Sequence, residues 1–162
     1  MVNELNGLIQ DILNSNVDLL SIAVKQRAKF EGWLKFELAR ALKKKYANTR
    51  VEYCIGEEKK VFVDIFSNDS FIELKTPNTN YRIADCDEKT RPITKNVSSI
   101  IDDITKLKAL NKKGYIAFVM FPLDEDKKYR THVDKIKDNL SDCRESIITV
   151  KEGSVLIFTG EI

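Results

Sequence analysis

Two apolar segments joined by a short polar turn constrain the fold of this chain more than any other feature. Residues 61–66 read Val-Phe-Val-Asp-Ile-Phe and residues 71–75 read Phe-Ile-Glu-Leu-Lys, with four polar residues between them. Segments this apolar are typical of strands in a sheet that is covered on both faces. The ionisable residues within them, Asp64, Glu73 and Lys75, therefore need partners or a function.

Helical and strand patterns alternate around this pair of segments. Apolar residues at three- and four-residue steps predict a helix over 3–14, and one long helix or two abutting ones over 17–45, with a bend at Gly32. The other predicted elements are a strand over 50–55, a hairpin turn over 56–60, a loop or flap over 76–96, a helix that starts at Ser98 or Ser99 with Asp102 in a capping box and ends at Gly114, a strand over 115–121, a helix over 129–140, and a hairpin of strands 146–150 and 154–158.

This order of elements predicts the class of fold. Three antiparallel strands, followed by a strand that is reached through a helix, are typical of a mixed sheet flanked by helices. The 162 residues, 43% apolar and 32% charged, fit one soluble domain with a single core. We therefore expect one α/β domain over 1–162, with an N-terminal helical segment at about 1–29.

Composition excludes several other classes of protein. No apolar run approaches the roughly 20 residues of a membrane span, and the N-terminus lacks the pattern of a secretory signal, so we expect a cytoplasmic protein and no membrane partner. Cys54, Cys86 and Cys143 are widely spaced, which argues against a disulfide framework or a zinc site. The net charge of +2 neither requires nor excludes a nucleic-acid partner.

The three ionisable residues of the apolar pair suggest a metal site. Side chains alternate along a strand, so Glu73 and Lys75 point to the same face. Antiparallel pairing of the two segments would bring Asp64 beside Glu73, where two carboxylates repel each other unless a cation or a proton intervenes. Mg²⁺ or Mn²⁺ prefers such oxygen ligands, and the carbonyl of Leu74 could add another. Lys75 could then orient a water and stabilise negative charge in a transition state.

Asp64 and the segment Glu73-Leu74-Lys75 resemble the motif of the PD-(D/E)XK nuclease superfamily. The resemblance covers roughly residues 30–121, and Val63 stands where the proline of the family's name would lie. It implies a restriction-endonuclease-like α/β/α sandwich with a mixed central sheet. The superfamily also commonly places a glutamate on the preceding helix. Glu37 falls within the apolar stripe of that helix and is preferred, with Glu31 as second choice.

The resemblance implies a Mg²⁺-dependent deoxyribonuclease, an endonuclease more than an exonuclease. Asp64, Glu73 and Leu74 would hold Mg²⁺ or Mn²⁺, and Lys75 would position the attacking water. Cutting both strands of DNA would require two copies of the chain, which suggests a homodimer. The residues expected to contact phosphates are Lys89, Arg91 and Lys95 in the loop. The solvent-facing side of the next helix is favoured for four lysines that lie on or after that helix, with the lining of a groove as the alternative; they are Lys106, Lys108, Lys112 and Lys113.

Two alternatives stay open at this point. The first is a nucleic-acid-binding or assembly subunit that has the same fold and does not cleave. The presence of Asp64, Glu73 and Lys75 together argues against it. The second is another small α/β enzyme that binds Mg²⁺ and a phosphate-containing ligand, although no glycine-rich phosphate loop supports it.

Overall fold

The computed structural model describes residues 1–56 and 60–162, so residues 57–59 of the predicted turn 56–60 lie outside the described part. Within these ranges the helices are α1 (Val2–Asn14), α2 (Val17–Gln26), α3 (Glu31–Lys43), α4 (Ile93–Ala109) and α5 (Arg130–Lys137). The strands are β1 (Arg50–Ile55), β2 (Val61–Ser67), β3 (Ser70–Lys75), β4 (Gly114–Met120), β5 (Asp142–Val150) and β6 (Gly153–Glu161).

All six strands form one mixed sheet in the order β1-β2-β3-β4-β6-β5. β3 and β4 pair in parallel, with α4 as the crossover between them, and the other neighbours pair antiparallel. A parallel pair requires such a crossover, because a tight turn can join only antiparallel strands. The prediction of a mixed sheet is therefore confirmed, and so is the prediction of an α/β fold.

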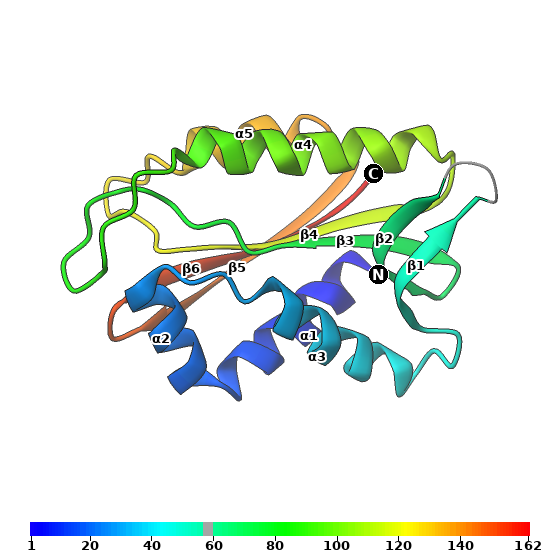
Figure 1. The fold of residues 1–162 in the computed structure, drawn as a ribbon, viewed down its shortest axis with the longest axis horizontal. Helices are drawn as coiled ribbons and strands as arrows, with labels where there is room; N and C mark the ends of the chain where they lie inside the picture. Colours follow the sequence, from blue (N-terminus) through cyan, green and yellow to red (C-terminus); the bar gives the residue numbers. More distant parts are fainter. Residues whose placement is uncertain (57–59) are drawn as a thin grey trace.

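Helices cover both faces of the sheet (Figure 1), with α1, α2 and α3 below it and α4 and α5 above it in this view. One apolar core packs α1–α3 against Ile65, Ile72 and Leu74, and a second packs α4 and α5 against the opposite face. Every residue of β4 is buried, which confirms its predicted central position. None of the helices in the described ranges has the length and apolar character that crossing a bilayer requires.

The predicted helix over 17–45 is interrupted at Arg27, whose φ of 50° ends α2 in the left-handed conformation. The chain resumes as α3 at Glu31, so the alternative of two helices is the correct one, and Gly32 lies in the first turn of α3 rather than at a bend. Arg27 is only 2% exposed, because its guanidinium group is enclosed by main-chain carbonyls described below. That burial depends on distant residues, which a local pattern does not reveal.

Four other elements have bounds that differ clearly from prediction. α4 begins at Ile93 after Pro92, not at Ser98 or Ser99, so the predicted capping box is wrong. Proline is suited to a helix start because its φ is fixed and its missing N–H would have no helical partner. β5 begins four residues before the predicted 146, and β6 begins one residue before the predicted 154 and ends three residues after the predicted 158. Hydrogen bonding between the two strands continues where the apolar pattern stops. α5 is shorter than the predicted 129–140.

Candidate active site

Asp64 lies at a break in the pairing of β2. The ladder with β3 runs from Ser67 to Ile65, and beyond it the Oδ2 atom of Asp64 accepts the main-chain N–H of Leu74 at 2.9 Å. The ladder with β1 is also interrupted at Asp64. The residue opposite is Glu52, whose φ of 49° departs from strand geometry. Strained backbone of this kind costs free energy and is concentrated at functional sites. The break leaves the Asp64 side chain directed at β3.

Glu73 lies beside Asp64 and is only 3% exposed. Burial raises the pKa of Glu73 to about 8, and a hydrogen bond to Asp64 adds to this increase, while Lys106 opposes it. Burial alone would also raise the pKa of Asp64, but the hydrogen bond from Glu73, the N–H of Leu74 and nearby lysines lower it overall. The two carboxyl groups therefore behave as a pair that holds one proton at neutral pH.

Two lysines from opposite faces of the sheet each contact one member of the pair. On α3, the ammonium of Lys35 lies 3.3 Å from Asp64 Oδ1 and also pairs with Glu52. On α4, the ammonium of Lys106 pairs with Glu73 Oε1. Each lysine reaches in from a different helix, so α3 and α4 line the two sides of the site.

Lys75 is held by two further carboxylates. Its ammonium lies 3.1 Å from Asp103 Oδ2 on α4 and 3.7 Å from Glu31 Oε1 on α3. The other oxygen of Glu31 accepts the main-chain N–H of Thr76 at 3.2 Å. Burial would lower the pKa of Lys75, but Glu31 and Asp103 raise it overall, so the side chain is a cation at neutral pH. Both Glu73 and Lys75 contact α4, as the strand alternation predicts.

The structure brings Glu31, not Glu37, to this group of residues. Glu31 and Lys35 are four residues apart on α3 and therefore face the same side of the helix. Glu37 points elsewhere and pairs with Arg40 at 2.6 Å. The preference for Glu37 is thus not supported. An acid within the apolar stripe of a helix is expected to point into the fold. Glu37 instead lies on a half-exposed part of α3.

Four residues of the site were not predicted from the sequence, namely Lys35, Glu52, Asp103 and Lys106. Lys106 was expected on the solvent-facing side of its helix, and that expectation is wrong, because its side chain is 33% exposed and its ammonium reaches Glu73. Asp103 and Lys106 are three residues apart on α4, a spacing that is common for exposed ion pairs. The spacing alone therefore does not show whether these two side chains face solvent or the site. The position of β3 under α4 shows that they face the site.

The donor atoms fit a hard divalent cation. Asp64 and Glu73 offer carboxylate oxygens, and the carbonyl of Leu74 points to the same edge of β3 as its N–H, toward Asp64. No three His, Cys, Asp or Glu side chains form a metal cluster within residues 1–56 and 60–162. Mg²⁺ does not require one, because it retains several waters and uses one or two carboxylates.

The charge of the site also suits a cation. Its carboxyl groups outnumber its ammonium groups by two, although the chain as a whole carries +2. Full ionisation would leave an excess of negative charge equal to that of one divalent cation. The carboxyl groups are Glu31, Glu52, Asp64, Glu73 and Asp103, and the ammonium groups are Lys35, Lys75 and Lys106.

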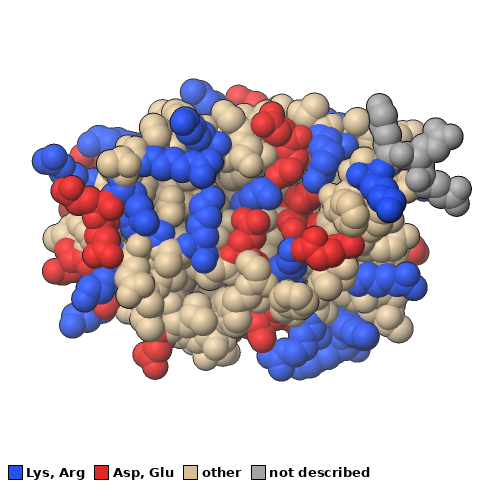
Figure 2. Space-filling view, viewed as in Figure 1, with Lys and Arg blue, Asp and Glu red and all other residues tan. Residues whose placement is uncertain are grey.

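Basic side chains surround this acidic centre. Figure 2 shows acidic residues near the middle of one face, with lysines and arginines on either side of them. Of the predicted phosphate contacts, Lys89 and Arg91 lie in the loop before α4 and Lys95 in the first turn of α4, and all three are exposed. Lys29, which was not predicted from the sequence, lies near both Arg91 of the loop and Glu31 of the site. Burial lowers its pKa, nearby Glu31 opposes this, and the like charges of Arg91 and Lys75 add to it.

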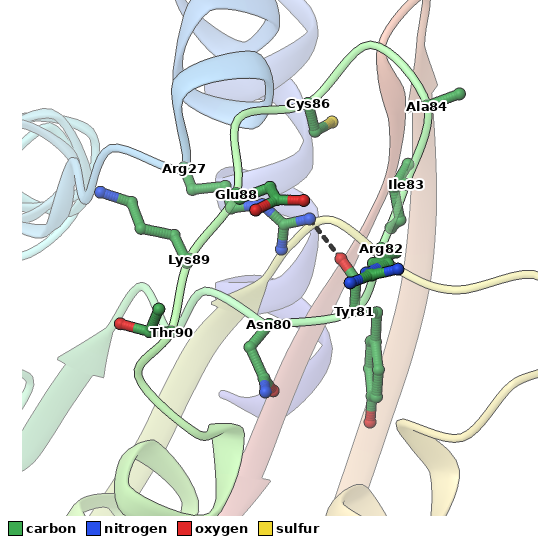
Figure 3. A pocket seen from close by; sticks show the side chains of 10 residues that line it. All are labelled: Arg27, Asn80, Tyr81, Arg82, Ile83, Ala84, Cys86, Glu88, Lys89 and Thr90. Atoms are coloured by element: carbon green, nitrogen blue, oxygen red, sulfur yellow. Dashed lines mark hydrogen bonds between the residues drawn. The ribbon is translucent and has the colours of Figure 1, made fainter.

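The loop between β3 and α4 is anchored at its base. The buried guanidinium of Arg27 donates hydrogen bonds to the carbonyls of Thr79 and Asp87, each at 2.5 Å, and to that of Tyr81. Figure 3 shows this guanidinium inside the curve of the loop. Arg27 and the loop residues line a pocket of about 410 Å³. Asn78 is buried and its amide donates to the carbonyl of Arg27 at 2.7 Å. The predicted loop is therefore correct up to residue 92, and it is fixed to the end of α2.

No family model, no curated protein and no solved structure matches this chain.

Proposed function

We propose that this chain is a metal-dependent nuclease that hydrolyses DNA phosphodiester bonds, with a fold of the restriction-endonuclease-like type. One observation carries the proposal: Asp64 and Glu73 form a buried carboxyl pair beside Lys75, at the point where β2 and β3 separate. The order of elements from α3 to β4 and the crossover α4 support the choice of fold.

Asp64, Glu73 and the carbonyl of Leu74 would hold Mg²⁺ or Mn²⁺. When bound, the cation would neutralise phosphate charge and make a water more acidic. Lys75 would orient the attacking water or stabilise the charge that develops on the phosphate oxygens. Glu31 and Asp103 act as positioning residues, because each contacts the Lys75 ammonium and raises its pKa.

The substrate would approach across the face shown in Figure 2. Phosphates flanking the reactive one would meet Lys29 and the exposed residues Lys89, Arg91 and Lys95. These contacts involve charge and not base edges, so they favour affinity over sequence specificity. A homodimer would supply the second active site that cutting both strands requires.

One observation favours a second candidate, a non-cleaving subunit that binds nucleic acid through the same face. Asp64 and Glu73 already have lysine partners, Lys35 and Lys106, within the chain. A network of this kind can be purely structural, because buried carboxylates require counter-charges in any protein.

Cleavage assays distinguish the two candidates. Supercoiled plasmid, linear duplex and single-stranded DNA would be incubated with the protein in Mg²⁺, in Mn²⁺ and in EDTA. We expect cleavage that requires metal and that is lost in Asp64→Asn and Lys75→Met. Glu37→Gln is a matched control, since it removes a charge from α3 outside the site. DNA binding without cleavage in either metal would favour the subunit, and no binding at all would contradict both.

A further inference from the structure

We infer that the ammonium of Lys106 occupies the Glu73 oxygen that a divalent metal needs and that the metal must displace it, so that this lysine sets the metal affinity of the site. The inference rests on the proposed function, because it requires Asp64 and Glu73 to be metal ligands. It concerns a residue that is not part of the Asp64, Glu73 and Lys75 motif.

The ammonium of Lys106 contacts three oxygen atoms of the chain. It donates hydrogen bonds to Glu73 Oε1 and to the carbonyl of Phe62 at 3.2 Å, and it lies 3.5 Å from Asp103 Oδ1. The first acceptor is an oxygen that a cation would need. The other two belong to β2 and α4, so Lys106 bridges the helix to the strand across the site.

Lys106 is the lysine whose contact conflicts most directly with a metal. Lys35 lies 3.3 Å from Asp64 and shares its charge with Glu52, which is 58% exposed. Lys75 pairs with Glu31 and Asp103 and not with the two proposed ligands. Glu73, by contrast, is buried and has Lys106 as its ammonium partner.

The Lys106 ammonium and a metal ion cannot both contact Glu73 Oε1 closely. The observed metal affinity is therefore the intrinsic affinity reduced by competition from Lys106. A metal can displace Lys106, because its side chain is 33% exposed and solvent can hydrate the ammonium once it leaves Glu73. Asp103 and the Phe62 carbonyl remain as acceptors at the edge of the site.

Lysine labelling of the unmodified protein tests the displacement directly. The protein would be treated briefly with an amine acetylating reagent, with and without saturating Mg²⁺, and each lysine quantified by mass spectrometry. We expect Mg²⁺ to increase labelling of Lys106 several-fold. Lys108, exposed on the same helix, is the internal control and should not change. Unchanged labelling of Lys106 under conditions in which Mg²⁺ binds would overturn the inference.

Metal titration of a variant provides the second test. Mn²⁺ binding to the wild type, Lys106→Met and Lys108→Met would be measured by calorimetry at about pH 8.5, where protons compete least for the carboxyl pair. We expect Lys106→Met to bind roughly tenfold more tightly, with Lys108→Met like the wild type. Equal or weaker binding by Lys106→Met, in a protein that cleaves DNA, overturns the inference and leaves the proposed function standing. Absence of Mn²⁺ and Mg²⁺ binding by all three proteins overturns both.

Discussion

Asp64 Oδ2 accepts the main-chain N–H of Leu74 at 2.9 Å, so a side chain provides the link between β2 and β3 where their ladder has ended. Asp64 is therefore a structural residue as well as a proposed metal ligand. A carboxylate that accepts a main-chain N–H contributes more than a neutral acceptor does, and leaving the N–H without a partner costs about 1–3 kcal/mol.

The two roles of Asp64 can be separated by substitution. Asp64→Asn keeps an acceptor of the same shape but not its charge, so we expect it to lose less stability than Asp64→Ala, which should lose about 1–3 kcal/mol. Both should abolish cleavage. Urea denaturation measures the stability, and Asp11→Ala on the exposed face of α1 is the control. Equal stability of the Asn and Ala variants would show that the hydrogen bond to Leu74 contributes nothing.

Glu31 and Glu37 should differ in their effect on catalysis. Removing the charge of Glu31 takes one of two carboxylates from the Lys75 ammonium, so the pKa of Lys75 should fall. We expect Glu31→Gln to lower kcat by roughly tenfold or more and Glu37→Gln to leave it unchanged. NMR titration of the Lys75 side chain in both variants tests the cause, and a pKa that stays constant in Glu31→Gln would contradict it.

The buried Glu73 predicts a specific dependence of stability on pH. The pKa of Glu73 is about 8 in the folded chain against an ordinary value of 4.5, so the folded state binds more protons between these two values. Stability therefore falls as pH rises across that interval, by at most about 1.4 kcal/mol per pH unit from this group. Below and above the interval the contribution is constant.

Glu73→Gln should remove this dependence. The variant is expected to gain stability relative to the wild type as the pH is raised from 4.5 to 8, because Gln does not ionise. Chemical denaturation at several pH values measures the difference between the two proteins, in which groups common to both cancel. A difference that is constant across the interval would mean that Glu73 titrates at its ordinary pKa.

Arg27 should be essential for the loop before α4. Its guanidinium donates to three carbonyls of that loop while 98% of its surface is buried, as its 2% exposure shows. Arg27→Lys keeps a charge but cannot reproduce this fork of donors, so we expect a loss of about 2–4 kcal/mol. Hydrogen exchange should rise in residues 78–87. Arg82→Lys, exposed in the same loop, should change neither quantity.

Lys29 and Arg91 should contribute to DNA affinity in a salt-dependent way. If each contacts one phosphate, replacing either by Met should weaken binding and reduce the slope of log K against log salt by about 1. Fluorescence anisotropy with a short duplex at several salt concentrations measures both effects. Lys137→Met on α5 is the control, because that lysine pairs with Glu145 away from the site. An unchanged slope for Lys29→Met would remove it from the DNA-binding surface.

Local sequence patterns were sufficient to predict most strands of the sheet and part of the site. Strand alternation depends only on neighbouring residues, so it correctly put Glu73 and Lys75 on one face, and the spacing to the preceding strand correctly put Asp64 beside Glu73. The buried strand β4 was likewise evident from its continuous apolar run. These features depend on period and composition, which are properties of the chain before it folds.

The partners of those residues depended on how distant elements pack. Glu31, Lys35, Asp103 and Lys106 lie on two helices on opposite faces of the sheet, and their spacings along each helix are those of ordinary surface charges. Whether such a residue faces water or the site depends on the rotation of each helix about its axis, which core packing determines. The same holds for Arg27, whose three carbonyl partners lie more than fifty residues away along the chain.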